Sequence, residues 1–274
     1  MIDNIKIFDS HLHYIGKFKR RDESLINFLD RFKIDKAVVT TLNKSANKNL
    51  LIRNDIDFDE NEYAEKFFAK KQYDHEEVRK LVKKNSDRLV GVYWFNPRIA
   101  DDNDWKILKN YIKDYNFKGV KVQASLDNLK MPNDLFKLAE FCINLDIPLF
   151  IHFGPSFFFQ EPFRVKNIYS LVKKYPELKC VILHAAYTME YCIGCLRYFA
   201  KCSNVYFETS LSVPYGINIL IKVIGNHRVM YGSDSPAATT PDIEINKIRI
   251  LNLDKHSLEN VFYNNISNLI GETL

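Results

Sequence analysis

Two histidines stand two positions apart near the start of the chain, where a short apolar run ends. His11 and His13 follow residues 5–8, which are β-branched and aromatic as in a strand. Because side chains i and i+2 of a strand point to the same side, both imidazole rings can reach one metal ion. Asp9 shares that side, and we expect its carboxylate to fix the tautomer of a histidine ring. Taken alone, such a pair is more often two surface histidines than a metal site.

Three further residues with metal-binding side chains stand at the ends of other apolar runs. His152 ends PLFIH, His184 ends CVILH, and Asp234 ends VMYGSD, and turn residues follow each of them. A single histidine in a strand is more often a core residue with satisfied hydrogen bonds. Together with the first pair, however, these residues make five ionisable groups at strand ends, which favours a shared metal site.

The elements that must position these residues are short apolar runs that alternate with amphipathic ones. Strands are predicted at 5–8, 36–42, 89–95, 119–124, 148–153, 180–184, 205–209 and 229–234, with helical segments between them and at the end of the chain. Alternation of this kind favours a parallel sheet, and about eight units in 274 residues favour closure into a (β/α)₈ TIM barrel. In such a barrel the strand ends converge on one bowl. An open doubly wound sheet is the alternative, although it would more comfortably carry a Gly-rich phosphate loop after its first strand.

A long polar segment at about 43–73 interrupts this alternation and mixes Asn, Lys, Asp and Phe. It exceeds the ~2–6 residues of a typical βα connection. Long βα loops of a barrel lie at the face where active sites are built. The segment is therefore predicted to be a lid or a substrate-contacting loop, with a tolerated surface insertion as the alternative. We expect one α/β barrel domain to span 1–274.

Composition and charge exclude several classes of function. The net charge of +5 is mild, and the basic residues fall in amphipathic stretches typical of solvated helix faces, so we expect no nucleic-acid partner. No stretch approaches the ~18 consecutive apolar residues of a membrane span. The N-terminal stretch does not resemble a secretory signal, and the five cysteines are irregularly spaced. We therefore expect a cytoplasmic protein that acts on a small molecule.

The ordered motifs resemble those of the amidohydrolase superfamily, and within it the amidohydrolase 2 branch. The matching stretches are FDSHLH, GVKV, IHFG, LHAA and YGSDSP, in this order and across nearly the whole chain. The run ENVFYNNISNLI also looks like the terminal segment of this branch. The resemblance implies a metal-dependent TIM-barrel enzyme related to aminocarboxymuconate-semialdehyde decarboxylase. Its relatives are often dimers, so a homodimer is one expectation.

The resemblance also implies roles for the strand-end residues. His11, His13, His152 and Asp234 would hold one divalent metal ion, and Asp234 would also transfer protons. His184 would act on the substrate instead of joining the main ligand set. Three imidazoles and one carboxylate suit Zn²⁺, with Mn²⁺ as the alternative. Such an ion lowers the pKa of a bound water from ~15.7 toward ~7.

Two neighbouring features bear on the substrate and on a second ion. Lys121 lies in GVKV, where binuclear members of the superfamily carry a carbamylated lysine that bridges two ions. Strand parity permits Lys121 to face the barrel. Because this branch is usually mononuclear, we favour a lysine that binds a substrate anion or forms an ion pair. Beside His184, Ala186 and Tyr187 stand where many members have a glycine, which narrows the bowl.

The function that the residues favour is hydrolysis of an amide, lactone or ester bond of a small molecule by a metal-activated water. Non-oxidative decarboxylation of a small unsaturated or aromatic carboxylate is the alternative, because relatives with the same ligand set catalyse it. TatD-type nucleases also begin with a histidine pair, but they carry a middle-strand glutamate that GVKVQA lacks. A binding protein on a degenerate barrel is a further alternative, against which the intact ligand set argues.

Overall fold

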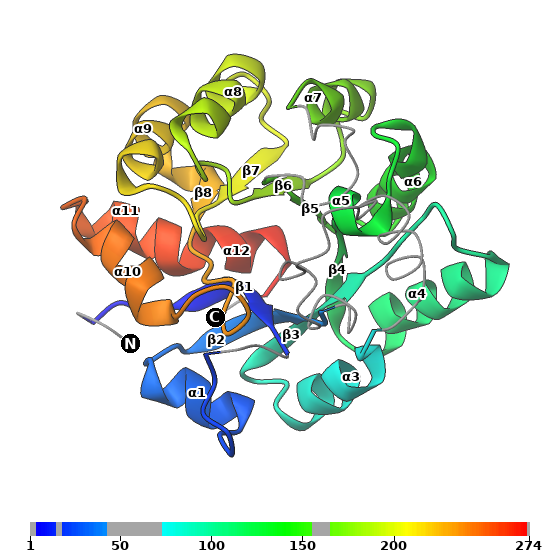
Figure 1. The fold of residues 1–274 in the computed structure, drawn as a ribbon, viewed down its shortest axis with the longest axis horizontal. Helices are drawn as coiled ribbons and strands as arrows, with labels where there is room; N and C mark the ends of the chain where they lie inside the picture. The colour runs from blue at the N-terminus through cyan, green and yellow to red at the C-terminus, as the bar shows by residue number, and fades with distance from the viewer. Residues whose placement is uncertain (1–3, 15–17, 43–72, 155–164, 273–274) are drawn as a thin grey trace, which may run out of the picture.

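Eight parallel strands form one sheet, in which each strand pairs with the next along the chain. The computed structural model describes residues 4–14, 18–42, 73–154 and 165–272, and Figure 1 shows helices surrounding the strands. The strands are β1 (Phe8–His13), β2 (Lys36–Thr40), β3 (Leu89–Trp94), β4 (Phe117–Val122), β5 (Leu149–His152), β6 (Cys180–Leu183), β7 (Val205–Glu208) and β8 (Val229–Met230).

Hydrogen bonds between the first strand and the segment after the last one close the sheet. Ser10 N donates to Tyr231 O at 3.1 Å, and His13 N donates to Ser235 O at 2.7 Å. A parallel bridge also joins Leu12 to Ser235. The chain therefore forms a (β/α)₈ TIM barrel, as its alternating elements predict, and not the open sheet.

Helices follow most of the strands and pack around the barrel (Figure 1). They are α1 (Leu25–Arg31), α3 (His75–Lys84), α4 (Asp102–Asp114), α5 (Ala124–Asp127), α6 (Phe136–Asn144), α7 (Val165–Lys174), α8 (Met189–Phe199), α9 (Pro214–Ile224), α10 (Pro241–Arg249), α11 (Lys255–Glu259) and α12 (Asn265–Leu269), with short turns of helix at Asn133–Leu135, Asn226–Arg228 and Asn260–Asn264. Local side chains set several helix starts: Ser24 Oγ accepts from Asn27 N before α1, and Asp101 and Asp104 form a capping box at α4. None of the helices in the described ranges is long and apolar enough to cross a membrane.

The interior of the barrel has an apolar layer toward the N-terminal ends of the strands and a polar layer at their C-terminal ends. The apolar layer includes Phe8, Val38, Val90, Val92, Phe150, Val181, Leu183 and Met230, which pack with Ile266 and Leu269 of α12. Further along the same strands, alternation places Trp94, Lys121, His152 and Glu208 toward the interior. Hydrophobic packing thus fills one end of the barrel and leaves the other end for chemistry.

An irregularity in β1 brings its histidines into the polar layer. The pairing of β1 with β2 shifts register between Asp9 and Leu12. Phe8 and His11 are an odd number of residues apart, so a regular strand would point them to opposite sides. The extra residue of a β-bulge re-aims the side chains that follow it. Phe8 can therefore belong to the apolar layer while His11 and His13 face the bowl. Nearly all of the long loop at about 43–73 lies outside the described residues, so its predicted role stays a prediction.

Candidate metal centre

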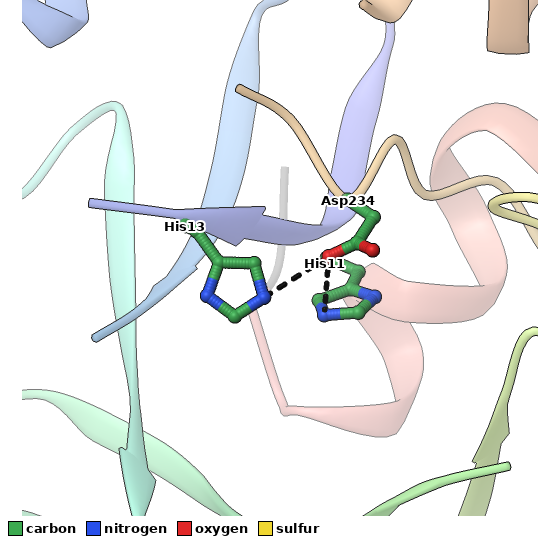
Figure 2. Close-up of side chains that lie close together, drawn as sticks. All are labelled: His11, His13 and Asp234. Carbon is green, nitrogen blue, oxygen red and sulfur yellow. Dashed lines mark ion pairs between the residues drawn. The ribbon is translucent and has the colours of Figure 1, made fainter. Parts of the chain in front are cut away.

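Three candidate ligands meet at the polar end of the barrel, two from β1 and one from the segment after β8. Figure 2 shows His11 and His13 directed toward Asp234. Asp234 Oδ1 lies 3.0 Å from His13 Nε2 and 3.4 Å from His11 Nε2. The three side chains are buried, and their ligand atoms lie within 4.8 Å of one another. The structure thus brings together three of the four ligands that the resemblance implies.

The backbone around these residues is held by Asp9, although not in the way that the sequence suggests. Its carboxylate accepts from His11 N at 3.1 Å, from Ser233 N at 3.0 Å and from Ser233 Oγ at 2.5 Å. Asp234 N in turn donates to His11 O at 2.7 Å. Asp9 therefore ties β1 to the segment after β8, and the expectation that it fixes a histidine ring is wrong.

Polar contacts on the far side of each ring indicate which nitrogen carries a proton. His13 Nδ1 lies 3.0 Å from Thr41 O, a carbonyl that can only accept. His11 Nδ1 lies 3.5 Å from Glu208 Oε2. We infer that both Nδ1 atoms carry hydrogen, which leaves lone pairs on both Nε2 atoms. These two lone pairs face Asp234 Oδ1 at 3.4 and 3.0 Å. Lone pairs and a carboxylate oxygen at this distance repel each other unless a cation lies among them. This donor set therefore fits a divalent metal ion.

The pKa shifts give the same charge states. Burial, and then the nearby Lys121 charge, lower the pKa values of His11 and His13, so both rings are neutral, as metal ligands must be. Burial alone would raise the pKa of Asp234, but that pKa is held well below its usual value, because positive charge in the cluster favours the carboxylate and the buried Lys121 ammonium interacts directly with it. The cluster therefore offers two neutral nitrogens and one carboxylate.

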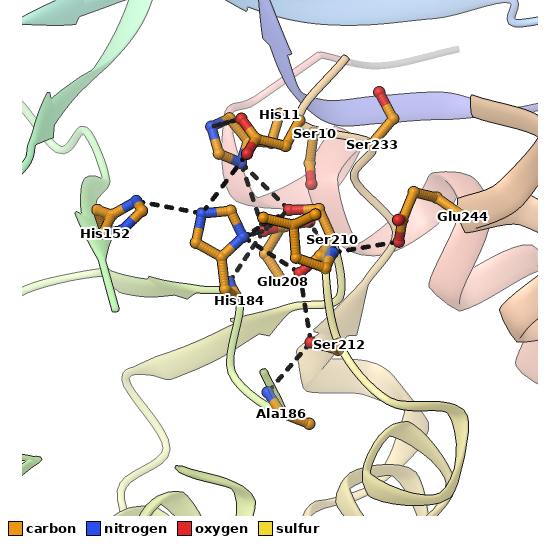
Figure 3. Close-up of polar contacts among 12 residues, drawn as sticks. Ser10, His11, His152, His184, Ala186, Glu208, Ser210, Ser212, Ser233 and Glu244 are labelled. Atoms are coloured by element: carbon orange, nitrogen blue, oxygen red, sulfur yellow. Dashed lines mark hydrogen bonds and ion pairs between the residues drawn. The ribbon is translucent and has the colours of Figure 1, made fainter. Parts of the chain in front are cut away.

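A second buried cluster adjoins the first and contains Glu208, a residue that the sequence interpretation missed. Figure 3 shows Glu208 in contact with both His11 and His184. Its Oε2 accepts from His184 N at 3.1 Å and from Ser210 Oγ at 2.8 Å, and its Oε1 accepts from Ser210 N at 2.5 Å. Glu208 also ends a strand, at VYFE, so the signal that identified the other residues was present here too.

His184 is held so that one ring nitrogen faces the first cluster. Its Nδ1 lies 3.1 Å from Ser210 O and 2.8 Å from Ser210 Oγ, whose own proton goes to Glu208. Nδ1 therefore donates, which leaves the lone pair of the neutral ring on Nε2. Nε2 lies 4.0 Å from Asp234 Oδ2, the carboxylate oxygen on the side away from His13. The carboxylate of Asp234 thus lies close enough to His184 Nε2 to stabilise a positive charge on that ring, although the two atoms are beyond hydrogen-bond distance.

His152, the fourth implied ligand, lies beside His184. Its Nδ1 is 3.2 Å from His184 Nε2, and Figure 3 shows this contact. His152 belongs to neither of the close ligand groups among the described residues. Its Nε2, however, is buried without a hydrogen-bond partner in the described structure. An orphaned ring nitrogen at the margin of the cluster is compatible with metal binding, so the role of His152 as a ligand stays a prediction.

One wall of the site is aromatic. The Trp94 ring lies 6.2 Å from the His13 ring, and its Nε1 donates to Asp127 Oδ2 at 2.9 Å. Tyr73 OH donates to Asp127 Oδ1 at 3.0 Å, and the Tyr73 ring lies 5.9 Å from that of Trp94. Asp127 therefore fixes a flat apolar surface beside the candidate metal ligands.

With this geometry established, the comparisons identify the family. The family model described as Amidohydrolase (Amidohydro_2) matches residues 51–269. This chain belongs to the amidohydrolase family. The match contains His152, His184 and Asp234 and begins after His11 and His13. The resemblance inferred from the motifs is confirmed, and the family is one of metal-dependent barrel enzymes.

Solved structures similar to this chain share its fold over almost the whole length. 5-Carboxyvanillate decarboxylase from Sphingomonas paucimobilis is 13% identical with a TM-score of 0.66, covering 98% of this chain and 100% of its own. 2,6-Dihydroxybenzoate decarboxylase from Rhizobium is 13% identical with a TM-score of 0.67, covering 97% and 99%. A putative amidohydrolase from Staphylococcus aureus is 16% identical with a TM-score of 0.68, covering 97% and 100%. No curated protein matches the chain.

Proposed function

We propose that this protein is a metal-dependent carboxy-lyase, which removes the carboxylate of a small aromatic or unsaturated acid as CO₂ without oxidation. The observation that carries the proposal is the convergence of His11 Nε2, His13 Nε2 and Asp234 Oδ1, with His184 Nε2 beside them. His11, His13 and Asp234, completed by His152, would hold one divalent ion. The ion would supply the positive charge that binds and orients the substrate carboxylate.

The sequence motifs favour hydrolysis, but the similar structures support decarboxylation instead. Two of them are decarboxylases of hydroxybenzoate-type acids, as described above. A dihydroxybenzoic acid decarboxylase from Polaromonas contains manganese and 2-nitroresorcinol, at 16% identity and a TM-score of 0.66 over 97% of both chains. The flat wall made by Trp94 suits an aromatic ring. We therefore propose Mn²⁺ or Zn²⁺ as the ion and a hydroxylated benzoate as the substrate class.

The residues of the chain account for the proton that the reaction needs. Decarboxylation breaks the bond between the ring carbon and the carboxylate carbon, and a proton replaces CO₂ on the ring. His184 Nδ1 is fixed by Ser210, so its Nε2 can carry that proton, and Asp234 Oδ2 at 4.0 Å stabilises the protonated ring. The burial of His184 and Asp234 keeps water away from the reacting carbon.

Hydrolysis is the second candidate, and the ionised state of Asp234 is the observation that favours it. A carboxylate whose pKa is held low stays ionised at neutral pH, and its Oδ2 is available to accept a proton from a water molecule. The description of the matched family and of the Staphylococcus aureus structure agrees with this reaction.

One experiment with isotopes separates the two reactions. The Mn²⁺-loaded protein is incubated with hydroxybenzoates labelled with ¹³C in the carboxylate, and with lactones and amides in H₂¹⁸O. A carboxy-lyase releases ¹³CO₂ and, in D₂O, places deuterium on the ring carbon. Incorporation of ¹⁸O into a product without release of CO₂ would establish hydrolysis instead. His184→Gln should lose the activity, whereas Lys118→Met, a charge change at a partly exposed position of β4, should keep it.

A further inference from the structure

A lysine side chain reaches the same nitrogen atoms that face the candidate metal position. Lys121, on β4, is buried, and strand alternation directs it into the barrel as the sequence predicts. Its Nζ lies 2.7 Å from His11 Nε2 and 3.1 Å from His13 Nε2. These are the two nitrogens that lie 3.4 and 3.0 Å from Asp234 Oδ1.

The inferred tautomers make this contact a charge-assisted pair of hydrogen bonds. Both Nδ1 atoms carry hydrogen, so both Nε2 atoms accept, and an ammonium group has three N–H donors. Lys121 thereby supplies the positive charge that the cluster of His11, His13 and Asp234 needs. Bonds of this kind are stronger than those between neutral groups, and burial strengthens them further.

The ammonium group and a metal ion cannot use these nitrogens at the same time. Each imidazole Nε2 has one lone pair, which either accepts a hydrogen bond or binds an ion. A divalent ion at His11 and His13 would also repel the positive charge of Lys121 at close range. The Trp94 ring already lies 4.9 Å from Nζ, so an ammonium group that leaves the two nitrogens can keep a favourable contact with this ring.

We propose that Lys121 is an internal cation that occupies the ligand cluster of the metal-free protein and competes with the divalent ion for it. The inference rests on the metal site of the proposed function but concerns a different property, the affinity of that site. Lys121 stabilises the metal-free barrel by compensating Asp234. Metal binding breaks its two hydrogen bonds to the histidines, which lowers the apparent affinity for the ion.

Metal titration of variants tests this competition. Isothermal titration with Mn²⁺ compares wild type, Lys121→Met and Lys118→Met, which removes the same charge from the same strand on a partly exposed side chain. We expect Lys121→Met to bind Mn²⁺ roughly tenfold more tightly or better, since no competitor must leave. Its metal-free form should melt at a lower temperature than metal-free wild type, and Lys118→Met should match wild type in both measurements.

The other outcomes separate the two proposals. Equal Mn²⁺ affinity in wild type and Lys121→Met overturns the competition and leaves the metal site intact. Weaker binding by Lys121→Met also overturns it, because Lys121 would then assist the ion, as a carbamylated lysine does. Absence of binding by all three proteins overturns both the competition and the proposed function.

A second measurement needs no variant, in case Lys121→Met does not fold. Crystal structures of wild type without metal and with Mn²⁺ should differ at one side chain. With Mn²⁺ bound, Lys121 Nζ should lie beyond hydrogen-bond distance of both His11 Nε2 and His13 Nε2. An unmodified Nζ that still donates to both nitrogens beside a bound ion would refute the proposal, and so would a carbamylated Lys121.

Discussion

Replacing Glu208 with glutamine tests how much the buried cluster behind the histidines contributes to stability. The carboxylate accepts three hydrogen bonds, from His184 N, Ser210 N and Ser210 Oγ, and it is completely buried. Glutamine keeps the shape but offers one acceptor oxygen and one NH₂ group. If the NH₂ group takes the Oε1 position, it faces Ser210 N. If it takes the Oε2 position, it faces His184 N.

At least one buried backbone N–H group therefore loses its acceptor in either orientation of the amide, which costs about 1–3 kcal/mol. Burial raises the pKa of Glu208, so the wild-type carboxylate is itself costly to bury, and removal of that charge offsets part of the loss. We expect Glu208→Gln to lower the free energy of unfolding by about 1–2 kcal/mol, since the backbone loss exceeds the partial offset.

Urea unfolding of the metal-free proteins at pH 7 measures this difference. Glu177→Gln is the matched control, because Glu177 is exposed and should change the free energy of unfolding by less than about 0.5 kcal/mol. If Glu208→Gln is as stable as wild type, the hydrogen bonds assigned to this carboxylate do not stabilise the fold, and the reasoning is refuted.

Two further substitutions test the packing behind His11 and the pH dependence of stability. A Cβ at Gly232 would clash with Glu208 Oε1 and would lie 2.9 Å from His11 Cβ, so Gly232→Ala should displace both side chains. We expect the displaced His11 to weaken Mn²⁺ binding about tenfold or more, as measured by isothermal titration. An unchanged affinity for Mn²⁺ would contradict this. Burial raises the pKa of Asp127 to about 7 from 3.8, so the native state binds the proton more tightly than the unfolded state and loses stability as pH rises from about 4 to 7. Asp127→Asn removes this loss of up to about 4 kcal/mol, and it keeps the hydrogen bonds because its oxygen can accept from Trp94 and Gln123 while the Tyr73 hydroxyl accepts from its NH₂ group. Urea unfolding between pH 4.5 and 8 should show wild type losing stability relative to the variant as pH rises, and parallel profiles would argue against it.

The sequence predicts the barrel because its strands and helices alternate, and each strand-end residue follows from the apolar run before it. His11, His13 and Asp234 do meet, and Lys121 faces inward as strand parity indicates. The register shift in β1 was not predictable, because a regular strand would satisfy the same pattern of apolar residues. Without that shift, the position of Phe8 in the apolar layer and that of His11 in the bowl would conflict.

Which strand-end residues contact one another depends on distances across the barrel, which no local pattern contains. His152 and His184 end neighbouring strands and meet each other, whereas Glu208 and His11 come from distant parts of the chain. Asp9 has the right parity for a ring contact, yet it binds backbone and hydroxyl donors of the closing segment instead. The side chains that contact and position the candidate ligands could therefore be identified only from the structure.

The most direct test of the account is the metal content of the purified protein. Wild type, Asp234→Ala and His152→Ala are dialysed against Mn²⁺ or Zn²⁺ and then analysed for bound metal and for cooperative unfolding. The account predicts one ion per chain in wild type and almost complete loss of that ion in folded Asp234→Ala. Wild-type protein that binds no ion, or folded Asp234→Ala that retains a full equivalent, would contradict it.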